Sequence, residues 1–293
     1  MITINKLLDT VLRDFQDYVE SQDRLCGLLE MHYDAGRLPD YNDIHNQQLY
    51  LLRYAYAYAF EYKRMYATLF DSIGYPKKIK VTSIGCGNLI DYWALAHVVG
   101  EECIIYYRGI DSVKWEYEIE KRVNDDLQVL HENAVALFQK TSNLSADIYM
   151  FPKSISEFSD EEIQTIADCF VTKLKGKKTV HLMFSLRKDS GNFISDFNRT
   201  RIIYNSFIRQ GFHSKQSAEQ TYYFEDPIKD QKISSVDNDF RHPWETVNYV
   251  TQLFLECSNF SNCIYQEQCK QKLGRWPILN CSYATWQTFS FER

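Results

Sequence analysis

The sequence predicts an α/β fold: a Rossmann-like, mostly parallel sheet with helices on both faces. Short apolar runs alternate with helical stretches from residue 78 to about residue 225, which is typical of a parallel sheet with crossover helices. The predicted strands are 80–84, 103–110, 127–131, 147–151 and 179–186, and the predicted helices are 88–99, 115–123, 134–140, one that begins with a capping box at Ser159 and Glu162, and 198–210. Segments 211–214 and 220–224 are expected to close the sheet as an antiparallel pair.

Two further segments flank this central Rossmann-like domain, which we place at residues 78–236. Residues 1–77 are expected to form a helical N-terminal extension, because apolar side chains recur there at helical spacing and residues 44–72 contain no Pro or Gly. Residues 237–293 break the alternation and carry four of the eight cysteines. We therefore expect a Cys-rich C-terminal extension.

The overall charge and hydropathy argue against some classes of function. A formal net charge of -6 does not suit a protein that coats nucleic acid through its overall charge. No run of about 18 apolar residues occurs, so no membrane span is expected. The N-terminal residues lack the cleavage site of a signal peptide. We expect a cytoplasmic protein, in which thiols stay reduced or bind metal.

A glycine-containing turn after the first predicted strand indicates a cofactor site. Gly85 allows a sharp turn, and Gly87 allows the backbone to approach a ligand closely. The next strand ends at Asp111, 24 residues after Gly87, where a carboxylate can accept hydrogen bonds from both hydroxyls of a ribose. A dinucleotide fingerprint would need a third glycine at position 90, which is Ile90.

The strand, Gly-x-Gly turn and helix resemble motif I of the class I S-adenosylmethionine-dependent methyltransferases. The resemblance implies that the turn holds the methionine part of the cofactor, that Asp111 holds the ribose, and that the residues after the third strand lie against the adenine. Many members carry another glycine where this chain has Leu89. The cofactor-binding residues so predicted are Ile84, Gly85, Cys86, Gly87, Asn88, Asp111, Ser112, Glu132, Asn133 and Phe151.

The segment after the fourth strand supplies the candidate catalytic residue. In the family this segment borders the methyl donor and the acceptor, and here it reads Phe151-Pro152-Lys153. It lacks the Asp/Asn-Pro-Pro-aromatic tetrapeptide of enzymes that methylate amino groups of bases, and no Pro-Cys dipeptide occurs for 5-cytosine chemistry. Lys153 could lower the pKa of an acceptor hydroxyl or hold a phosphate, with Ser154 or Glu157 orienting it. The alternative is a solvated loop lysine.

A basic stretch points to an anionic acceptor. Residues 173–215 contain ten Lys or Arg residues and two acidic residues. Arg187 and Lys188 directly follow the fifth strand, at the edge of the sheet that would hold the cofactor. This pattern favours an RNA-like, phosphate-bearing partner that is bound through Arg187 and Lys188. The alternative is ordinary solubilising surface charge.

The cysteines near the C-terminus form a candidate metal site. Cys257, Cys263, Cys269 and Cys281 lie within 25 residues, and four thiolates suffice for tetrahedral zinc. Their spacing differs from the usual Cys-x-x-Cys pairs, so reduced thiols and an iron–sulfur cluster stay open as alternatives. A zinc ion here would be structural and would stabilise the C-terminal extension by cross-linking its cysteines.

The leading hypothesis is an S-adenosylmethionine-dependent methyltransferase that acts on an unidentified, anionic and RNA-like acceptor. A second hypothesis is a module or sensor that binds the same cofactor without transferring a methyl group. A third is a nicotinamide-dependent oxidoreductase, which Ile90 disfavours.

Overall fold

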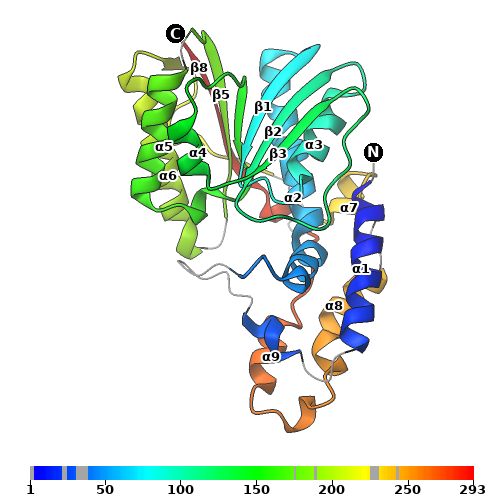
Figure 1. Cartoon of the computed structure of the whole chain (residues 1–293). Helices are drawn as coiled ribbons and strands as arrows, with labels where there is room; N and C mark the ends of the chain where they lie inside the picture. Colours follow the sequence, from blue (N-terminus) through cyan, green and yellow to red (C-terminus); the bar gives the residue numbers. More distant parts are fainter. Residues whose placement is uncertain are drawn as a thin grey trace. The chain divides into compact units, whose positions relative to one another are not determined.

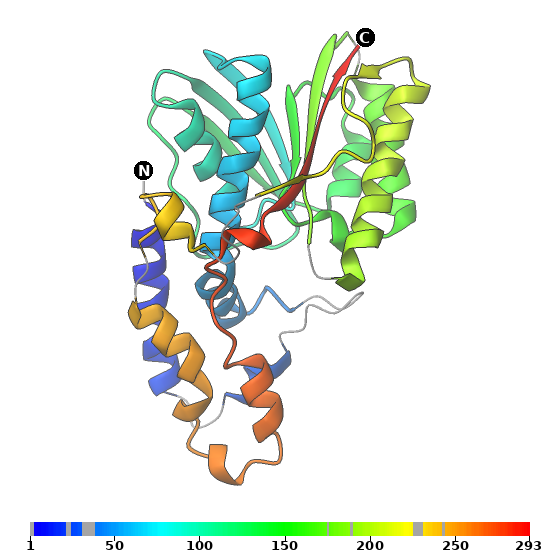
Figure 2. The same ribbon diagram turned by 180° about the vertical axis from the view of Figure 1, so that it is seen from behind.

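The computed structural model of the chain describes residues 3–21, 25–30, 39–174, 176–187, 190–224, 231–241 and 244–293. It comprises two compact units, which we call the helical unit and the sheet unit (Figures 1 and 2). The helical unit consists of Met1–Tyr58, Trp115–Glu120 and Asp226–Ser282, and the sheet unit of Ala59–Lys114, Lys121–Glu225 and Tyr283–Arg293. These units differ from the three consecutive parts expected from the sequence, because each combines distant segments of the chain.

The sheet unit is built on a sheet whose described strands follow the order β3-β2-β1-β4-β5-β8-β6, with β7 also paired to β8. Its strands are β1 (Lys78–Ile84), β2 (Ile104–Asp111), β3 (Asp126–His131), β4 (Ile148–Phe151), β5 (Thr179–Ser185), β6 (His213–Ser214), β7 (Tyr222–Tyr223) and β8 (Thr285–Glu292). The first five strands pair in parallel, which confirms the predicted Rossmann-like sheet. β8 is antiparallel to β5.

Helices cover both faces of this sheet. Figures 1 and 2 show α4 (Ala134–Lys140), α5 (Asp160–Lys173) and α6 (Ser190–Arg209) on one face, and α3 (Ile90–Val99) on the other. The predicted capping box of α5 is present: the Ser159 hydroxyl accepts a hydrogen bond from the Glu162 amide (3.2 Å), and the Glu162 carboxylate accepts one from the Ser159 amide (2.8 Å).

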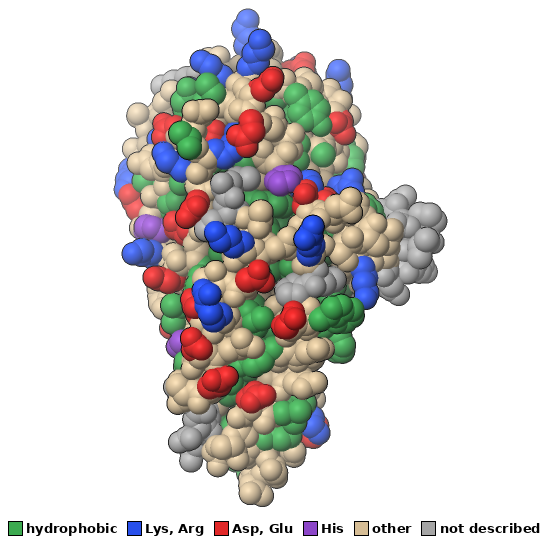
Figure 3. Space-filling model, turned by 90° about the vertical axis from the view of Figure 1, so that its right-hand side faces the viewer, with side chains coloured by type: hydrophobic (Ala, Val, Ile, Leu, Met, Phe, Trp, Pro, Cys, Tyr) green, Lys and Arg blue, Asp and Glu red, His purple; other side chains and the backbone are tan. Residues whose placement is uncertain are grey.

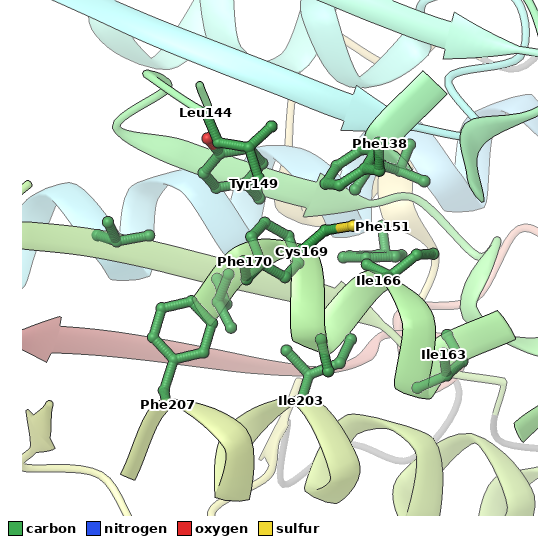
Figure 4. Packing of buried hydrophobic residues seen from close by; sticks show 14 of the residues in the cluster. Phe138, Leu144, Tyr149, Phe151, Ile163, Ile166, Cys169, Phe170, Ile203 and Phe207 are labelled. Carbon is green, nitrogen blue, oxygen red and sulfur yellow. The ribbon is translucent and has the colours of Figure 1, made fainter. Parts of the chain in front are cut away.

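Aromatic side chains fill the space between the sheet and the helices α5 and α6 (Figure 4). The largest of the fully buried ones in this cluster are Phe138, Tyr149, Phe151, Phe170, Phe184 and Phe207. Burying one such ring contributes about 1.5–3 kcal/mol, so this cluster is a main source of the stability of the sheet unit. It also holds the strand ends, where a ligand would bind, on a rigid base.

The last strand of the sheet is missing from the sequence-based prediction. β8 lies within the segment expected to be a Cys-rich extension, and yet it inserts between β5 and β6. The predicted closing pair forms only as the two-residue strands β6 and β7, and each of them pairs with β8 rather than with the other. A central antiparallel strand thus arrives from the far end of the chain.

The helix predicted for residues 115–123 is not formed. Residues after Trp115 follow an irregular path, and the buried guanidinium of Arg122 fixes the end of this segment. Arg122 donates to the Asp125 carboxylate (2.8 Å) and to the carbonyl oxygens of Gly100 (2.6 Å) and Cys103 (2.7 Å). Satisfying this buried cation outweighs the helical preference of the segment.

The helical unit combines the N-terminal residues with residues near the C-terminus. Its elements are α1 (Ile4–Glu20), η1 (Cys26–Glu30), the first part of α2 (Ile44–Ile73), α7 (Ile233–Val236), α8 (Trp244–Gln252), η3 (Leu253–Glu256), η4 (Phe260–Asn262) and α9 (Gln266–Lys272). The Tyr56 hydroxyl donates to Asn5 Oδ1 (2.9 Å), and Arg53 donates to the Leu273 carbonyl oxygen (2.7 Å). Among the described helices, none has the length and apolar character needed to cross a membrane.

Candidate cofactor site

The turn between β1 and α3 has the backbone geometry of a ligand-binding loop. Gly85 (φ +72°) and Gly87 (φ +54°) both adopt left-handed conformations. A Cβ atom on Gly85 would lie 2.4 Å from Cβ of Ser154, so only glycine fits beneath the segment that follows β4. The amides of Gly85 and Cys86 both donate to the Ile110 carbonyl oxygen, at 2.7 Å and 3.2 Å, which ties the loop to the end of β2.

Leu89 takes the same kind of conformation without being glycine. It has φ 70° and ψ 25° directly before α3, and its side chain is buried. A left-handed conformation costs a non-glycine residue roughly 1–2 kcal/mol, while burying a leucine contributes about 1.5–3 kcal/mol. The buried side chain therefore offsets the strain, and the turn keeps its shape although the third glycine of the family pattern is missing.

Asp111 ends β2 beside this loop, as predicted. Its Oδ2 accepts a hydrogen bond from the Gly87 amide (2.8 Å), and its Oδ1 accepts one from the Val113 amide (2.9 Å). Burial raises the pKa of Asp111, and these two hydrogen bonds oppose that rise. Each carboxylate oxygen keeps capacity for a further hydrogen bond, so a ribose diol can still bind. Ser112, the next residue, is exposed.

The remaining loop residues differ in their surroundings. Ile84 is fully buried, and Cys86 is buried against Gly109, where an added Cβ would lie 2.6 Å from the Cys86 sulfur. Asn88 is also buried, and within the described residues its Nδ2 has no hydrogen-bond partner. An orphaned buried donor at the start of a helix suits an anionic ligand group such as a carboxylate. The loop therefore fits the methionine part of the predicted cofactor.

The predicted adenine contacts follow β3. Glu132 forms an ion pair with Lys140 on the surface. Asn133 is the N-cap of α4, and its Oδ1 accepts a hydrogen bond from the Ala136 amide (3.0 Å). Phe151 is fully buried and stacks on Phe184 in the core, so the structure places it under the site as support.

Lys153, the candidate catalytic residue, lies in a buried polar network. Its ammonium forms an ion pair with Glu61 (2.9 Å) and donates a hydrogen bond to the Leu186 carbonyl oxygen. Glu61 also accepts hydrogen bonds from the Ser185 hydroxyl and the Thr285 amide. Burial raises the pKa of Glu61, and Lys153 opposes that rise. This network joins α2 to β4, β5 and β8, so a role in positioning suits Lys153 better than proton transfer.

The basic stretch after residue 173 is largely engaged within the protein. Arg187 Nε lies 3.5 Å from Oδ2 of the buried Asp196, and Lys188 lies outside the described residues. The other basic residues with partners in the sheet unit are Lys173, Lys177, Arg199 and Arg201. These contacts favour the alternative interpretation, ordinary surface and structural charge. Figure 3 shows a different face of the molecule, away from α5 and α6, on which acidic and basic side chains are intermixed.

The four C-terminal cysteines lie in the helical unit, and a metal site there is not supported. Across the described ranges, no group of three or more His, Cys, Asp or Glu residues is arranged to hold a metal ion. Burial raises the pKa of the Cys269 thiol, and the nearby Cys263, Cys26 and Cys257 add to that rise. Cys26, which the sequence pattern did not include, thus lies near Cys269 as well. The α9 helix, η1 and η4 bring them together by packing, which sequence spacing does not reveal.

Two acidic residues of the sheet unit have surroundings that the sequence patterns did not indicate. Asp91, in the first turn of α3, is fully buried and accepts a hydrogen bond from the Tyr107 hydroxyl (2.8 Å). Glu157 follows β4 at the end of η2 (Ile155–Glu157), beside the glycine loop. The sequence analysis named Glu157 only as a residue that could orient Lys153. A pattern of apolar and polar residues does not show which carboxylates become buried or face one another.

A cavity of about 230 Å³ lies elsewhere in the sheet unit. Its lining includes Lys80, Tyr106, Arg108 and Gln128, which belong to the earlier parts of β1, β2 and β3, and residues around the end of α4. Ligands of open α/β sheets bind at the carboxyl ends of the strands instead. The glycine loop, and not this cavity, is therefore the candidate cofactor site.

Comparisons with known proteins give structural likenesses only. No family model matches the chain, and no curated protein sequence matches it. A SAM-dependent methyltransferase from Archaeoglobus fulgidus is similar at 12% identity and a TM-score of 0.38, over 79% of this chain and 94% of that one. The cyclopropane synthase MmaA2 from Mycobacterium tuberculosis is similar at 10% identity and 0.40, over 95% and 98%. Human N-acetylserotonin methyltransferase, solved with SAM, is similar at 15% identity and 0.39, over 72% and 64%.

The assignment of the fold rests on this chain's own topology, because those likenesses are distant. Five parallel strands lie in the order 3-2-1-4-5, and an antiparallel strand stands between the fifth and the sixth. The left-handed glycine loop follows the first strand, and the anchored carboxylate ends the second. The chain therefore has a Rossmann-like α/β fold, with the glycine loop and the anchored carboxylate at the carboxyl ends of its first two strands.

Proposed function

We propose that this protein is an S-adenosylmethionine-dependent methyltransferase. The observation that carries the proposal is the junction of the glycine loop and Asp111, where the Gly87 amide donates to the carboxylate at 2.8 Å. This hydrogen bond sets the loop, the ribose acceptor and the first turn of α3 in one rigid arrangement. Leu89 keeps the left-handed turn despite its strain, as expected where a ligand needs the backbone in that shape.

When bound, the cofactor would supply a methyl group activated on a sulfonium: the acceptor would form a bond to the methyl carbon, and the sulfur would leave as a neutral thioether. The chain's residues perform the binding and the alignment. Asp111 would accept hydrogen bonds from the ribose hydroxyls, the loop would hold the methionine part, and Asn88 Nδ2 would donate a hydrogen bond to the carboxylate of that part. Alignment of two reactants accounts for a large part of the acceleration of such a transfer. No strong general base is needed where the acceptor is already a nucleophile.

An RNA-like acceptor stays a proposal that depends on Arg187. Because Asp196 engages the guanidinium, that proposal requires the pair to open or to present its outer face. A protein that binds the cofactor without transferring a methyl group is the second candidate. The buried ion pair between Lys153 and Glu61 favours this second candidate, because it occupies the ammonium of the candidate catalytic residue.

Calorimetric titration with S-adenosylmethionine, S-adenosylhomocysteine and NAD tests the binding. We expect both sulfur compounds to bind, and Asp111→Asn to weaken the methyl donor by more than about tenfold, or roughly 1.4 kcal/mol. Asp126→Asn, which removes an exposed carboxylate from β3, is the matched control and should bind normally. Binding of NAD alone would refute the proposal.

Transfer is tested with the donor labelled in its methyl group. The labelled donor is incubated with separate RNA, DNA, protein and small-molecule fractions. Label that enters one fraction, and does so less with Asp111→Asn, supports the methyltransferase and identifies the acceptor class. Tight binding with no transfer to any fraction supports the second candidate.

A further inference from the structure

The cavity of about 230 Å³ in the sheet unit lies beside the end of α4, which is a short helix. α4 contains seven residues, about 10 Å of helix, and the hydroxyl of the capping residue Thr141 donates to the Leu137 carbonyl oxygen (2.7 Å). β1 also contains seven residues, but as an extended strand it spans about 23 Å. The helix therefore cannot cover the whole length of the strands, and the cavity lies where it ends.

Side chains from neighbouring parallel strands form the floor of this cavity. Lys80 on β1 pairs in register with Tyr106 on β2, and Arg108 stands two residues after Tyr106, on the same face of the sheet. Adjacent strands are about 4.8 Å apart and alternate residues of one strand about 6.6 Å, so the Cα atoms of Lys80 and Arg108 are about 8 Å apart. Both side chains are long enough to reach one ligand group that lies between them.

The two cations of the floor have no partner in the part of the chain that the structure describes. Neither the Lys80 ammonium nor the Arg108 guanidinium forms an ion pair or a hydrogen bond there, and both side chains are exposed. The nearby Asp147 accepts a hydrogen bond from the Lys80 backbone amide (3.0 Å), and its carboxylate forms an ion pair with Lys177. Asp126 is the one acidic residue of the described lining. A positive charge is thus left over, which favours an anionic ligand.

Apolar side chains line another part of the cavity. Phe138, Leu144 and Tyr149 line it and also belong to the buried core drawn in Figure 4. The ring centroids of Phe138 and Tyr149 are 6.4 Å apart. An apolar body on the ligand would cover this surface and remove it from water. The volume lies below the roughly 300–1,000 Å³ of pockets for drug-sized ligands, so the ligand that fits is small.

From this combination we propose that the cavity is a second binding site, separate from the candidate cofactor site, for a small organic anion. The carboxylate or phosphate of the ligand binds to Lys80 and Arg108, and its apolar body lies against Phe138 and Leu144. The guanidinium supplies a planar fork of donors that matches either anionic group. The proposal does not depend on the methyl donor, because the floor of the cavity belongs to the earlier parts of the strands and the glycine loop to their carboxyl ends.

Calorimetric titration with phenyl phosphate and with benzoate tests this site. Both probes carry a ring and an anionic group, and the tighter of the two identifies phosphate or carboxylate as the preferred group. Arg108→Gln should weaken that probe about tenfold, because it removes one of the two cations that bind the anion. Arg201→Gln, which removes an exposed guanidinium from α6, is the control for net charge and should leave the affinity unchanged.

Asp126→Asn provides a variant with the opposite expected sign. Removal of the carboxylate that repels the anion should strengthen binding about threefold, whereas a disturbance of the fold would weaken it. Benzyl alcohol, which has the ring without the charge, and inorganic phosphate, which has the charge without the ring, should bind more weakly than phenyl phosphate. No binding of either anionic probe, an affinity that Arg108→Gln leaves unchanged, or an equal loss in Arg201→Gln would overturn the inference. Titration of the wild type with S-adenosylmethionine decides the proposed function independently of these outcomes.

Discussion

Replacing Asp91 by Asn should change how the stability of the protein depends on pH. Asp91 is fully buried under the glycine loop, where it accepts a hydrogen bond from Tyr107. Burial raises its pKa from 3.8 to about 6, and the hydrogen bond from Tyr107 opposes the rise. No ion pair compensates its charge within the described residues. The folded protein therefore carries the cost of an ionised buried carboxylate at neutral pH.

The magnitude follows from the shift. Each pKa unit corresponds to about 1.36 kcal/mol, so a rise from 3.8 to about 6 represents roughly 3 kcal/mol. Because the folded pKa lies above the unfolded one, the stabilising contribution of the neutral form is complete below about pH 4. It is lost as pH rises toward about 6. The free energy of unfolding of Asp91→Asn, relative to wild type, should therefore increase by about 3 kcal/mol between pH 4 and pH 7.

Guanidinium chloride unfolding at pH 4, 5, 6 and 7 measures this difference. The variant should match the wild type, or be slightly less stable, at pH 4, and should gain relative stability at each step up to pH 7. Asp126→Asn, on the exposed edge of β3, controls for the removal of one negative charge. A difference between Asp91→Asn and wild type that stays constant over the whole range would refute the reasoning.

Two further substitutions test the loop and the buried ion pair. Gly85→Ala adds a Cβ only 2.4 Å from Ser154, whereas Gly74→Ala has a positive φ but nothing within 4 Å. Calorimetry should therefore show cofactor binding lost only in Gly85→Ala, and equal binding by the two variants would contradict the loop geometry. Lys153→Met leaves Glu61 buried and unpaired and should cost about 3–5 kcal/mol of unfolding free energy, most of it recovered in Lys153→Met with Glu61→Met. Additive losses in the double variant would contradict the pairing.

The local sequence pattern was enough to predict the five parallel strands of the sheet and the glycine loop after the first of them. β1 to β5 lie close to their predicted positions, and the capping box at Ser159 starts α5. These features depend on interactions between residues near in sequence: alternating burial, a cap, and glycines that allow left-handed turns. The left-handed backbone conformation of Leu89 could not be predicted from local preferences, because leucine disfavours it and only tertiary packing stabilises it.

Features that depend on distant partners could not be predicted in this way. The segment around Arg122 is irregular although its sequence pattern is helical, because the partners of Arg122 lie in the turn between α3 and β2 and directly before β3. Lys153 could be placed near the carboxyl ends of the strands, but its pairing with Glu61 joins residues 92 positions apart. The ionisation of Asp91 and Glu157 depends on burial and neighbouring charge, neither of which sequence spacing encodes.

The sequence by itself determined that this protein has a parallel α/β sheet with a glycine loop after the first strand and a carboxylate at the end of the second. Only the tertiary structure decided that β8 enters the sheet from the end of the chain, beside a strand about a hundred residues earlier. It also decided that Lys153, after β4, pairs with Glu61 of α2. The physical reason is that local preferences act over a few residues, whereas strand pairing and charge proximity arise only when the chain has packed.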